Sequence, residues 1–325
     1  MTSSDSASAI GFLSHDGKSQ IRGLVWQPVR AAGSRDASPR GIVQIVHGMS
    51  EYVGRYDEFA RFLAGRGFVV CGTDHIGHGK SVANLEELGR MPSRGGKDVL
   101  VEDVHQLRLT VAARYARQTP YILFGHSMGS FIVRSYLARS GEGVSAAVLS
   151  GTGQPPFLLS KAGNLMARRI ASFKGDDYRS TFLDGLGAGS FAKKIPDART
   201  PFDWLSTDPQ VVDSYLADDQ CGTMFSAGAY ATLTELTADA VSRRLASKIP
   251  HDLPLLFVSG ADDPVGDFGK GVHEAAEFMR RAGIERVDEM LYPGMRHEIL
   301  NEPGRMQVYT DVSHWIEEHA CRATS

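Results

Sequence analysis

Six short apolar runs, each ending in glycine or a polar turn, constrain the fold of this 325-residue chain more than any other feature. They are rich in Val, Ile and Leu, which is typical of parallel strands buried on both faces of a sheet. A more mixed run, 21–28, indicates an earlier strand at a sheet edge. The six apolar runs are 41–48, 68–74, 121–127, 146–153, 254–263 and 288–294.

Segments with helical periodicity alternate with these runs. Residues 99–118 carry one apolar stripe, and residues 268–283 and 303–320 have a similar pattern. Strands that alternate with helices predict an α/β fold with a mostly parallel, doubly wound sheet. The stripe in the first helical segment consists of Val101, Val104, Leu107, Val111 and Tyr115.

The alternation stops between residues 154 and 250, where no convincing buried strand occurs. We therefore expect a core formed by residues 1–153 and 251–325, with a mainly helical cap inserted at 154–250. Insertions at the carboxyl ends of strands usually cover the ligand-binding crevice of an open sheet. A stretch at 157–174 mixes apolar with basic residues, so it favours either a cap helix that packs on the crevice or peripheral contact with a membrane.

Composition and charge exclude several classes of protein. A formal net charge of −3 provides no basic surface for nucleic acid. Cys71, Cys221 and Cys321 suit neither a disulfide framework nor a zinc site, so we expect reduced thiols in a cytoplasmic protein. The N-terminus does not have the pattern of a signal peptide, and no apolar run approaches the ~20 residues that span a bilayer. The sequence gives no indication of oligomeric state.

The segment "DHIGHGKS" (74–81) contains two histidines and the last three residues of a phosphate-binding loop. The glycine that such a loop requires at the first position is Asp74 here, and no further metal ligands cluster nearby. We therefore expect no metal and no organic cofactor.

The run 121–127 leads into the pentapeptide "GHSMG" (125–129), which fits the pattern G-x-S-x-G. Between an apolar strand and a helical segment, this pattern predicts a nucleophile elbow. Gly125 and Gly129 leave room for a turn sharp enough to project the hydroxyl of Ser127 out of the sheet. Ser127 is therefore the candidate nucleophile.

A serine hydroxyl needs a base, and in this kind of fold an acid and then a histidine follow the serine along the chain. The end of the fifth apolar run and the residues after it offer Asp262, Asp263 and Asp267, and the loop after the last run offers His297. His297 would accept the proton of Ser127, while one aspartate would orient the imidazole and stabilise its charged form.

Acyl transfer also needs two backbone N–H groups that face the developing negative charge. One is expected from the residue after the nucleophile, Met128, and the other from the loop after an early strand. In that loop Met49 follows His47 and Gly48, so the Met49 amide is the second candidate donor.

With these elements assembled, the chain resembles the α/β-hydrolase superfamily, and within it the monoacylglycerol lipase and lysophospholipase-like branch. The resemblance extends from about Ile21 to the C-terminus. Three segments carry it: "HGMSEYVGRYDEF" (47–59) is similar to HG-x-x-E-x-x-x-RY, "DHIGHGKS" (74–81) is similar to D-x-x-GHG-x-S, and "GHSMG" (125–129) is the usual elbow.

The resemblance implies an α/β-hydrolase fold with a helical cap, and it selects Asp263 as the acid. It also implies that Glu51 and Arg55 bind the polar glycerol end of a monoacylglycerol. The chain departs from the family pattern at two positions. Tyr52 replaces a histidine that is common after the glutamate, and Leu300 stands where some of these lipases place a second histidine.

Together, these observations predict a serine hydrolase that cleaves carboxylic esters, with a lipid-like substrate such as monoacylglycerol or lysophospholipid. Two alternatives stay open. A peptidase of the proline iminopeptidase type would need cap carboxylates to hold a free amino terminus, and Asp176, Asp177, Asp184 and Asp208 are available. A non-enzymatic ligand-binding protein on the same scaffold would usually lack one member of the triad, whereas all three are present here.

Overall fold

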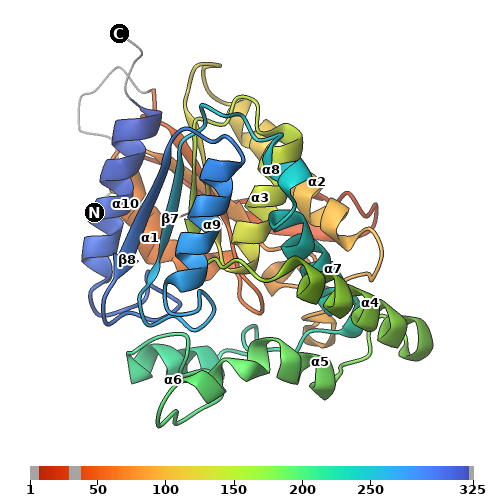
Figure 1. The fold of residues 1–325 in the computed structure, drawn as a ribbon. Helices are drawn as coiled ribbons and strands as arrows, with labels where there is room; N and C mark the ends of the chain where they lie inside the picture. The colour runs from red at the N-terminus through yellow and green to blue at the C-terminus, as the bar shows by residue number, and fades with distance from the viewer. Residues whose placement is uncertain (1–6, 29–37, 322–325) are drawn as a thin grey trace.

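The computed structural model describes residues 7–28 and 38–321, so residues 1–6 and 322–325 of the expected core and the segment 29–37 lie outside the described residues. An eight-stranded sheet has the order β1-β2-β4-β3-β5-β6-β7-β8 (Figure 1). β1 and β2 are antiparallel to their neighbours, and the other six strands are parallel. The strands are β1 Ser8–Leu13, β2 Gln20–Trp26, β3 Ile42–Val46, β4 Val69–Thr73, β5 Tyr121–His126, β6 Ala146–Ser150, β7 Leu255–Gly260 and β8 Val287–Tyr292.

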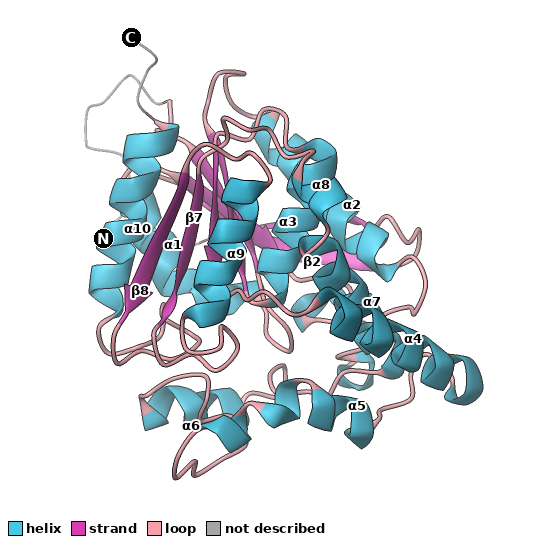
Figure 2. Ribbon diagram, viewed as in Figure 1, coloured by secondary structure: helices cyan, strands magenta, loops and turns pink. Residues whose placement is uncertain are grey.

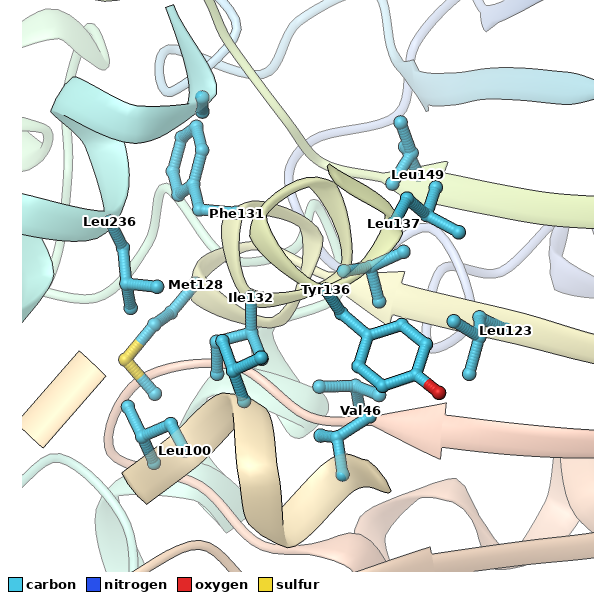
Figure 3. Close-up of a cluster of buried hydrophobic side chains, with 14 of the residues drawn as sticks. Val46, Leu100, Leu123, Met128, Phe131, Ile132, Tyr136, Leu137, Leu149 and Leu236 are labelled. Atoms are coloured by element: carbon cyan, nitrogen blue, oxygen red, sulfur yellow. The ribbon is translucent and has the colours of Figure 1, made fainter. Parts of the chain in front are cut away.

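Helices cover both faces of the sheet (Figure 2). Alternate residues of β5 point to opposite faces: Ile122 and Phe124 pack with α1 and α10, while Tyr121 and Leu123 pack with α2 and α3. Figure 3 shows the apolar cluster on the α2 and α3 face, which includes Leu123 and is centred on α3. The helices are α1 Asp57–Gly65, α2 Gly96–Ala112, α3 Met128–Ser140, α4 Phe157–Lys174, α5 Thr181–Leu186, α6 Pro209–Ala217, α7 Ala227–Ala240, α8 Arg243–Ala246, α9 Lys270–Arg281 and α10 Arg305–Ala320.

The predicted α/β-hydrolase fold is confirmed, with three corrections to the elements. The run 21–28 is not an edge strand, because β1 pairs along its outer side. The strand β1 was not predicted: five of its six residues are exposed or only partly buried, and Gly11 interrupts its short apolar stretch. The helix expected at 99–118 ends at Ala112, where hydrogen bonds between residues three apart tighten the last turns.

The described chain between β6 and β7 forms helices α4 to α8 and two short 3-10 turns. Helix α7 packs on α2 and α3 of the core, and α4 packs on α7. Helices α5 and α6 lie beyond the end of the sheet at which β7 and β8 terminate (Figures 1 and 2). No helix among residues 7–28 and 38–321 is long and apolar enough to cross a membrane. The exact cap boundaries, 154–250, stay a prediction.

Candidate active site

Ser127 lies in a sharp turn between β5 and α3. Its backbone has φ 53° and ψ −119°, a conformation that L-residues rarely adopt, and its N–H donates to the Ser150 carbonyl at 2.8 Å. The two flanking glycines permit close packing of the backbone. A Cβ atom on Gly125 would lie 2.6 Å from the Gly129 carbonyl oxygen, and one on Gly129 would collide with the Val46 carbonyl oxygen. The chain therefore forms this turn only with glycine at both positions.

Substituting Gly129 by alanine is expected to lower the free energy of unfolding by about 3 kcal/mol or to prevent folding, because the new methyl group meets backbone that cannot rotate away. Urea denaturation measures the effect. Gly65→Ala is the matched control, since a Cβ at that helical position meets nothing within 4 Å and should change stability by no more than ~1 kcal/mol. Equal stability of the two variants would contradict the steric account.

The structure pairs His297 with Asp263, and both side chains are buried. The Nδ1–H of His297 donates to Oδ2 of Asp263 at 2.8 Å, which leaves Nε2 of a neutral ring as the proton acceptor. The Asp263 carboxylate also accepts hydrogen bonds from the Val265 N–H at 2.8 Å and the Ser259 hydroxyl at 3.1 Å. Burial alone would lower the pKa of His297, but the negative charge of Asp263 outweighs it and raises this pKa above 6.5.

The elbow and the histidine loop meet at His126, the residue before Ser127. The His126 and His297 rings lie 4.7 Å apart between centroids. Burial, followed by the charge of His297, lowers the pKa of His126 to about 3, so His126 stays neutral at physiological pH. The described contacts include no hydrogen bond between the Ser127 hydroxyl and His297. Such bonds are often long before substrate binds.

Met49 lies in the loop after β3, and Met128 directly follows Ser127. Met128 is the first residue of α3, so its N–H has no acceptor within the helix. Among the described hydrogen bonds neither amide has an acceptor. The Met128 side chain points into the apolar cluster beside Leu100 and Leu236 (Figure 3), so this residue offers the site its backbone rather than its side chain.

Two buried histidines fix the loop that carries Met49. The His75 N–H donates to Nε2 of His47 at 3.0 Å, and the His75 ring contacts the His47 carbonyl oxygen at 3.2 Å. Nδ1 of His47 then donates to the Gly48 carbonyl at 2.8 Å. Burial lowers the pKa of both rings, that of His75 to about 3, so both stay neutral. His75 of the "DHIGHGKS" segment therefore supports the loop that carries Met49.

Glu51 and Arg55 form a buried network with a third residue that the sequence did not single out, Glu298. Arg55 binds Glu298 through two hydrogen bonds of 2.6 and 2.7 Å and reaches Glu51 at 3.2 Å. Glu51 also accepts from the Gly48 N–H at 2.5 Å and the Tyr56 hydroxyl at 2.7 Å. The network thus joins the Met49 loop to the His297 loop.

The two carboxyls of this network have opposite pKa shifts. Burial opposes ionisation of both; the guanidinium of Arg55 outweighs it at Glu298, whose pKa is lowered, but not at Glu51, whose pKa is raised. Glu51 and Arg55 also line a small cavity beside His126. Their binding of a substrate's polar end stays a prediction, although the structure gives both side chains internal partners.

Sequence reasoning also missed Trp204 and Glu302. The Trp204 ring packs on the His297 ring at 5.1 Å between centroids, although the two residues are 93 positions apart. Glu302 is buried near the same loop. Glu298 and Glu302 follow His297 closely in the sequence, and charged residues next to an expected base could have been predicted to belong to the site. Trp204, inside the insertion, had no such sequence signal.

Comparison with known proteins was made for sequence and for fold. A family model described as serine aminopeptidase, S33, matches residues 37–304. The chain is similar to a monoacylglycerol lipase from Mycolicibacterium smegmatis, with 32% identity over 302 residues, which is 91% of this chain and 92% of the relative. It is also similar to the monoglyceride lipase of Mus musculus, at 25% identity over 92% of this chain and 87% of the relative.

Two solved structures illustrate the similarity of fold. One is a thermostable carboxyl esterase from Bacillus coagulans in complex with glycerol, with a TM-score of 0.87, 31% identity, and coverage of 97% of this chain and 99% of that chain. The other is a soluble variant of monoglyceride lipase from Saccharomyces cerevisiae in complex with a substrate analog, with a TM-score of 0.74, 18% identity, and coverage of 99% and 97%. The second likeness concerns the fold alone.

Proposed function

The chain belongs to the serine aminopeptidase S33 family of α/β-hydrolases and to its monoacylglycerol lipase-like branch, and we propose that it cleaves lipid-like carboxylic esters through an acyl-enzyme on Ser127. Membership of this branch makes the chain a hydrolase of the esterase and lipase type. The observation that carries this proposal is the buried 2.8 Å pair of His297 and Asp263 beside the strained elbow. A strained backbone and a desolvated acid–base pair are typical of catalytic sites.

In the proposed mechanism, Nε2 of His297 accepts the hydroxyl proton while Oγ of Ser127 forms a bond to the ester carbonyl carbon. The carbonyl π electrons move to oxygen, and the Met49 and Met128 amides stabilise this oxyanion, aided by the positive end of the α3 dipole. Asp263 stabilises the imidazolium. The C–O bond to the alcohol then breaks as His297 returns the proton, and a water molecule activated by His297 hydrolyses the acyl-enzyme.

The pH dependence of kcat/KM tests the assignment of His297 as base. Only neutral His297 can accept the serine proton, and Asp263 favours its charged form, so activity should fall as pH decreases through a pKa above 6.5. The measurement is kcat/KM for p-nitrophenyl butyrate between pH 5 and 9. An acidic limb with a midpoint well below pH 6.5 would contradict the assignment.

The acyl preference decides whether the substrate is a lipid. Hydrolysis of p-nitrophenyl esters from acetate to palmitate, with Ser127→Ala as control, measures it directly. We expect a maximum at medium or long chains, followed by turnover of a monoacylglycerol and a lysophospholipid. Activity confined to acetate and butyrate would reject the lipid substrate, and no turnover of any ester would reject the proposal.

A peptidase is the second candidate, because the family model is described as an aminopeptidase. The four cap carboxylates that such an enzyme could use already have partners. They accept from the Ser93 N–H (Asp176, 2.8 Å), Arg90 (Asp177, 3.2 Å), the Tyr230 hydroxyl (Asp184, 2.6 Å) and the Gln210 N–H (Asp208, 2.9 Å). We therefore expect no hydrolysis of aminoacyl-naphthylamides, and efficient hydrolysis of them would favour the peptidase.

We also propose that helices α4 and α5 rest on an anionic lipid surface. The small buried residues of α4, Ser160, Ala167 and Ala171, lie on its inner face, and Asn164 donates to the Ala231 carbonyl of α7 at 2.7 Å. Large apolar side chains lie on the outer face and continue onto α5. Basic residues among them complement an anionic membrane. The apolar residues are Phe157, Leu158, Leu159, Leu165, Met166, Phe173, Phe182 and Leu186, and the basic ones are Lys161, Arg169 and Lys174.

Replacing Leu158 and Phe173 together by glutamate should weaken binding to vesicles of phosphatidylglycerol and phosphatidylcholine by at least ~10-fold. These two side chains are 80% and 81% exposed, so the protein should stay folded and hydrolyse a soluble short ester at the normal rate. Vesicle co-sedimentation measures binding. Leu109→Glu, at a 53% exposed position of α2, is the matched control. Equal binding of all three proteins would reject the membrane surface.

A further inference from the structure

A segment of the insertion lies along the loop that carries His297. The N–H of Glu298 donates to the Leu205 carbonyl at 2.7 Å, and the N–H of His297 contacts the Trp204 carbonyl at 3.4 Å. The indole ring of Trp204 packs on the imidazole of His297. Residues 203–207 therefore contact His297 through both its backbone and its ring.

Glu302 joins the two segments by a second set of bonds. Its fully buried carboxylate accepts from the Arg296 N–H at 2.7 Å and from the Thr207 N–H at 3.0 Å. The hydroxyls of Ser206 and Thr207 donate to the same carboxylate. The donors come from the residue before His297 and from the insertion, so one side chain holds both.

Arg296 reinforces this contact from the opposite direction. Its guanidinium donates to the Asp203 carbonyl at 2.6 Å and the Ser206 carbonyl at 3.1 Å. A buried carboxylate is stable only while several donors surround it, and here three of the four donors belong to residues 206 and 207. Undocking of this segment would leave Glu302 short of partners and the His297 loop without support.

We propose that Glu302 is a positioning residue that aligns His297 by clamping the loop 296–302 onto residues 203–207 of the insertion. This inference rests on the proposed role of His297 as base. Glu302 does not touch the substrate. It couples the docking of the insertion to the geometry of the base, so that proton transfer is efficient only while residues 203–207 are in place.

Glu302→Ala should lower kcat for p-nitrophenyl butyrate by about 10- to 100-fold, the cost of misplacing a catalytic group by roughly 1 Å, while KM changes less than about twofold. Glu302→Gln should restore most of kcat, because the amide oxygen can accept from the two N–H groups and the NH₂ group can donate to the hydroxyls. A kcat for Glu302→Ala within about twofold of the original protein would overturn the proposal.

Asp103→Ala is the matched control. Asp103 lies on α2, away from the loop that carries His297. Its buried carboxylate accepts hydrogen bonds from the Ser14 hydroxyl and the His15 N–H, both at 2.7 Å. It should lower the melting temperature but leave kcat unchanged. Amide hydrogen exchange should accelerate at 203–207 and 296–302 together in Glu302→Ala and at neither segment in Asp103→Ala. Equal loss of kcat in both variants would overturn the proposal.

If Glu302→Ala fails to fold, Ser206→Ala combined with Thr207→Val keeps the carboxylate and removes its two hydroxyl donors. We expect a drop in kcat of about threefold or more and faster exchange at both segments. Unchanged kcat and exchange would overturn the proposal. If the original protein hydrolyses no ester, the proposed function fails, and the exchange experiment still decides whether Glu302 clamps the two segments.

Discussion

Replacing Ser127 by alanine should lower kcat for p-nitrophenyl butyrate by about 10⁴-fold or more, because no other group in the elbow can form the acyl-enzyme. The substitution removes one oxygen atom and changes no described backbone contact, since the Ser127 hydrogen bonds that the structure contains involve its N–H and its carbonyl. The protein should therefore keep its circular dichroism spectrum and its melting temperature.

Ser135→Ala provides the matched control for this prediction. Ser135 is buried on the same helix, α3, and its hydroxyl has no hydrogen-bond partner among the described residues. Its loss should leave kcat within about twofold of the original value. Substantial hydrolysis by purified Ser127→Ala protein would show that the nucleophile lies elsewhere.

Asp263→Asn has the second largest expected effect, a fall in kcat of about 10⁴-fold with little change in structure. The carboxamide has nearly the same shape, but it carries no charge, and its NH₂ group favours the tautomer of His297 with the proton on Nε2. That tautomer cannot accept the serine proton. The acidic limb of the pH profile should also move to lower pH, because the charge that raises the pKa of His297 has been removed.

The neighbouring aspartate gives the control for this change. Asp262 precedes Asp263 directly and its side chain is exposed, so Asp262→Asn should change kcat by less than about threefold. Steady-state rates and the pH profile of both variants are needed. A large loss of kcat in Asp262→Asn together with a small loss in Asp263→Asn would show that Asp262, and not Asp263, orients His297.

The sheet was largely predictable because its central strands are buried on both faces. Runs such as 121–127 begin with uninterrupted apolar residues and end in glycine or a polar turn, and the structure has a strand at each of the six positions. The outermost strand, β1, escaped prediction for the opposite reason: it is mostly exposed, so its stability comes from pairing with β2 rather than from its own composition.

The candidate site was predictable where chemistry dictates local sequence. The elbow needs two glycines within five residues, and the acid and base must follow strands that end at one edge of the sheet. The pairings of Arg55 with Glu298 and of Thr207 with Glu302 join residues 243 and 95 positions apart, and no local pattern encodes them. Such partners become visible only when the chain is folded, because buried charges accept whichever donors the fold brings close.

The most direct test of the central claim is rapid mixing of the protein with p-nitrophenyl butyrate, followed by mass spectrometry of the quenched protein. The account predicts a burst of p-nitrophenol that does not exceed one equivalent and an added butyryl group on the peptide that contains Ser127. Both should be absent in Ser127→Ala. The experiment is repeated at low pH, where deacylation is slow and an acyl-enzyme accumulates. Ester turnover without an acyl adduct on Ser127 under these conditions would contradict the account. An adduct on another residue would also contradict it.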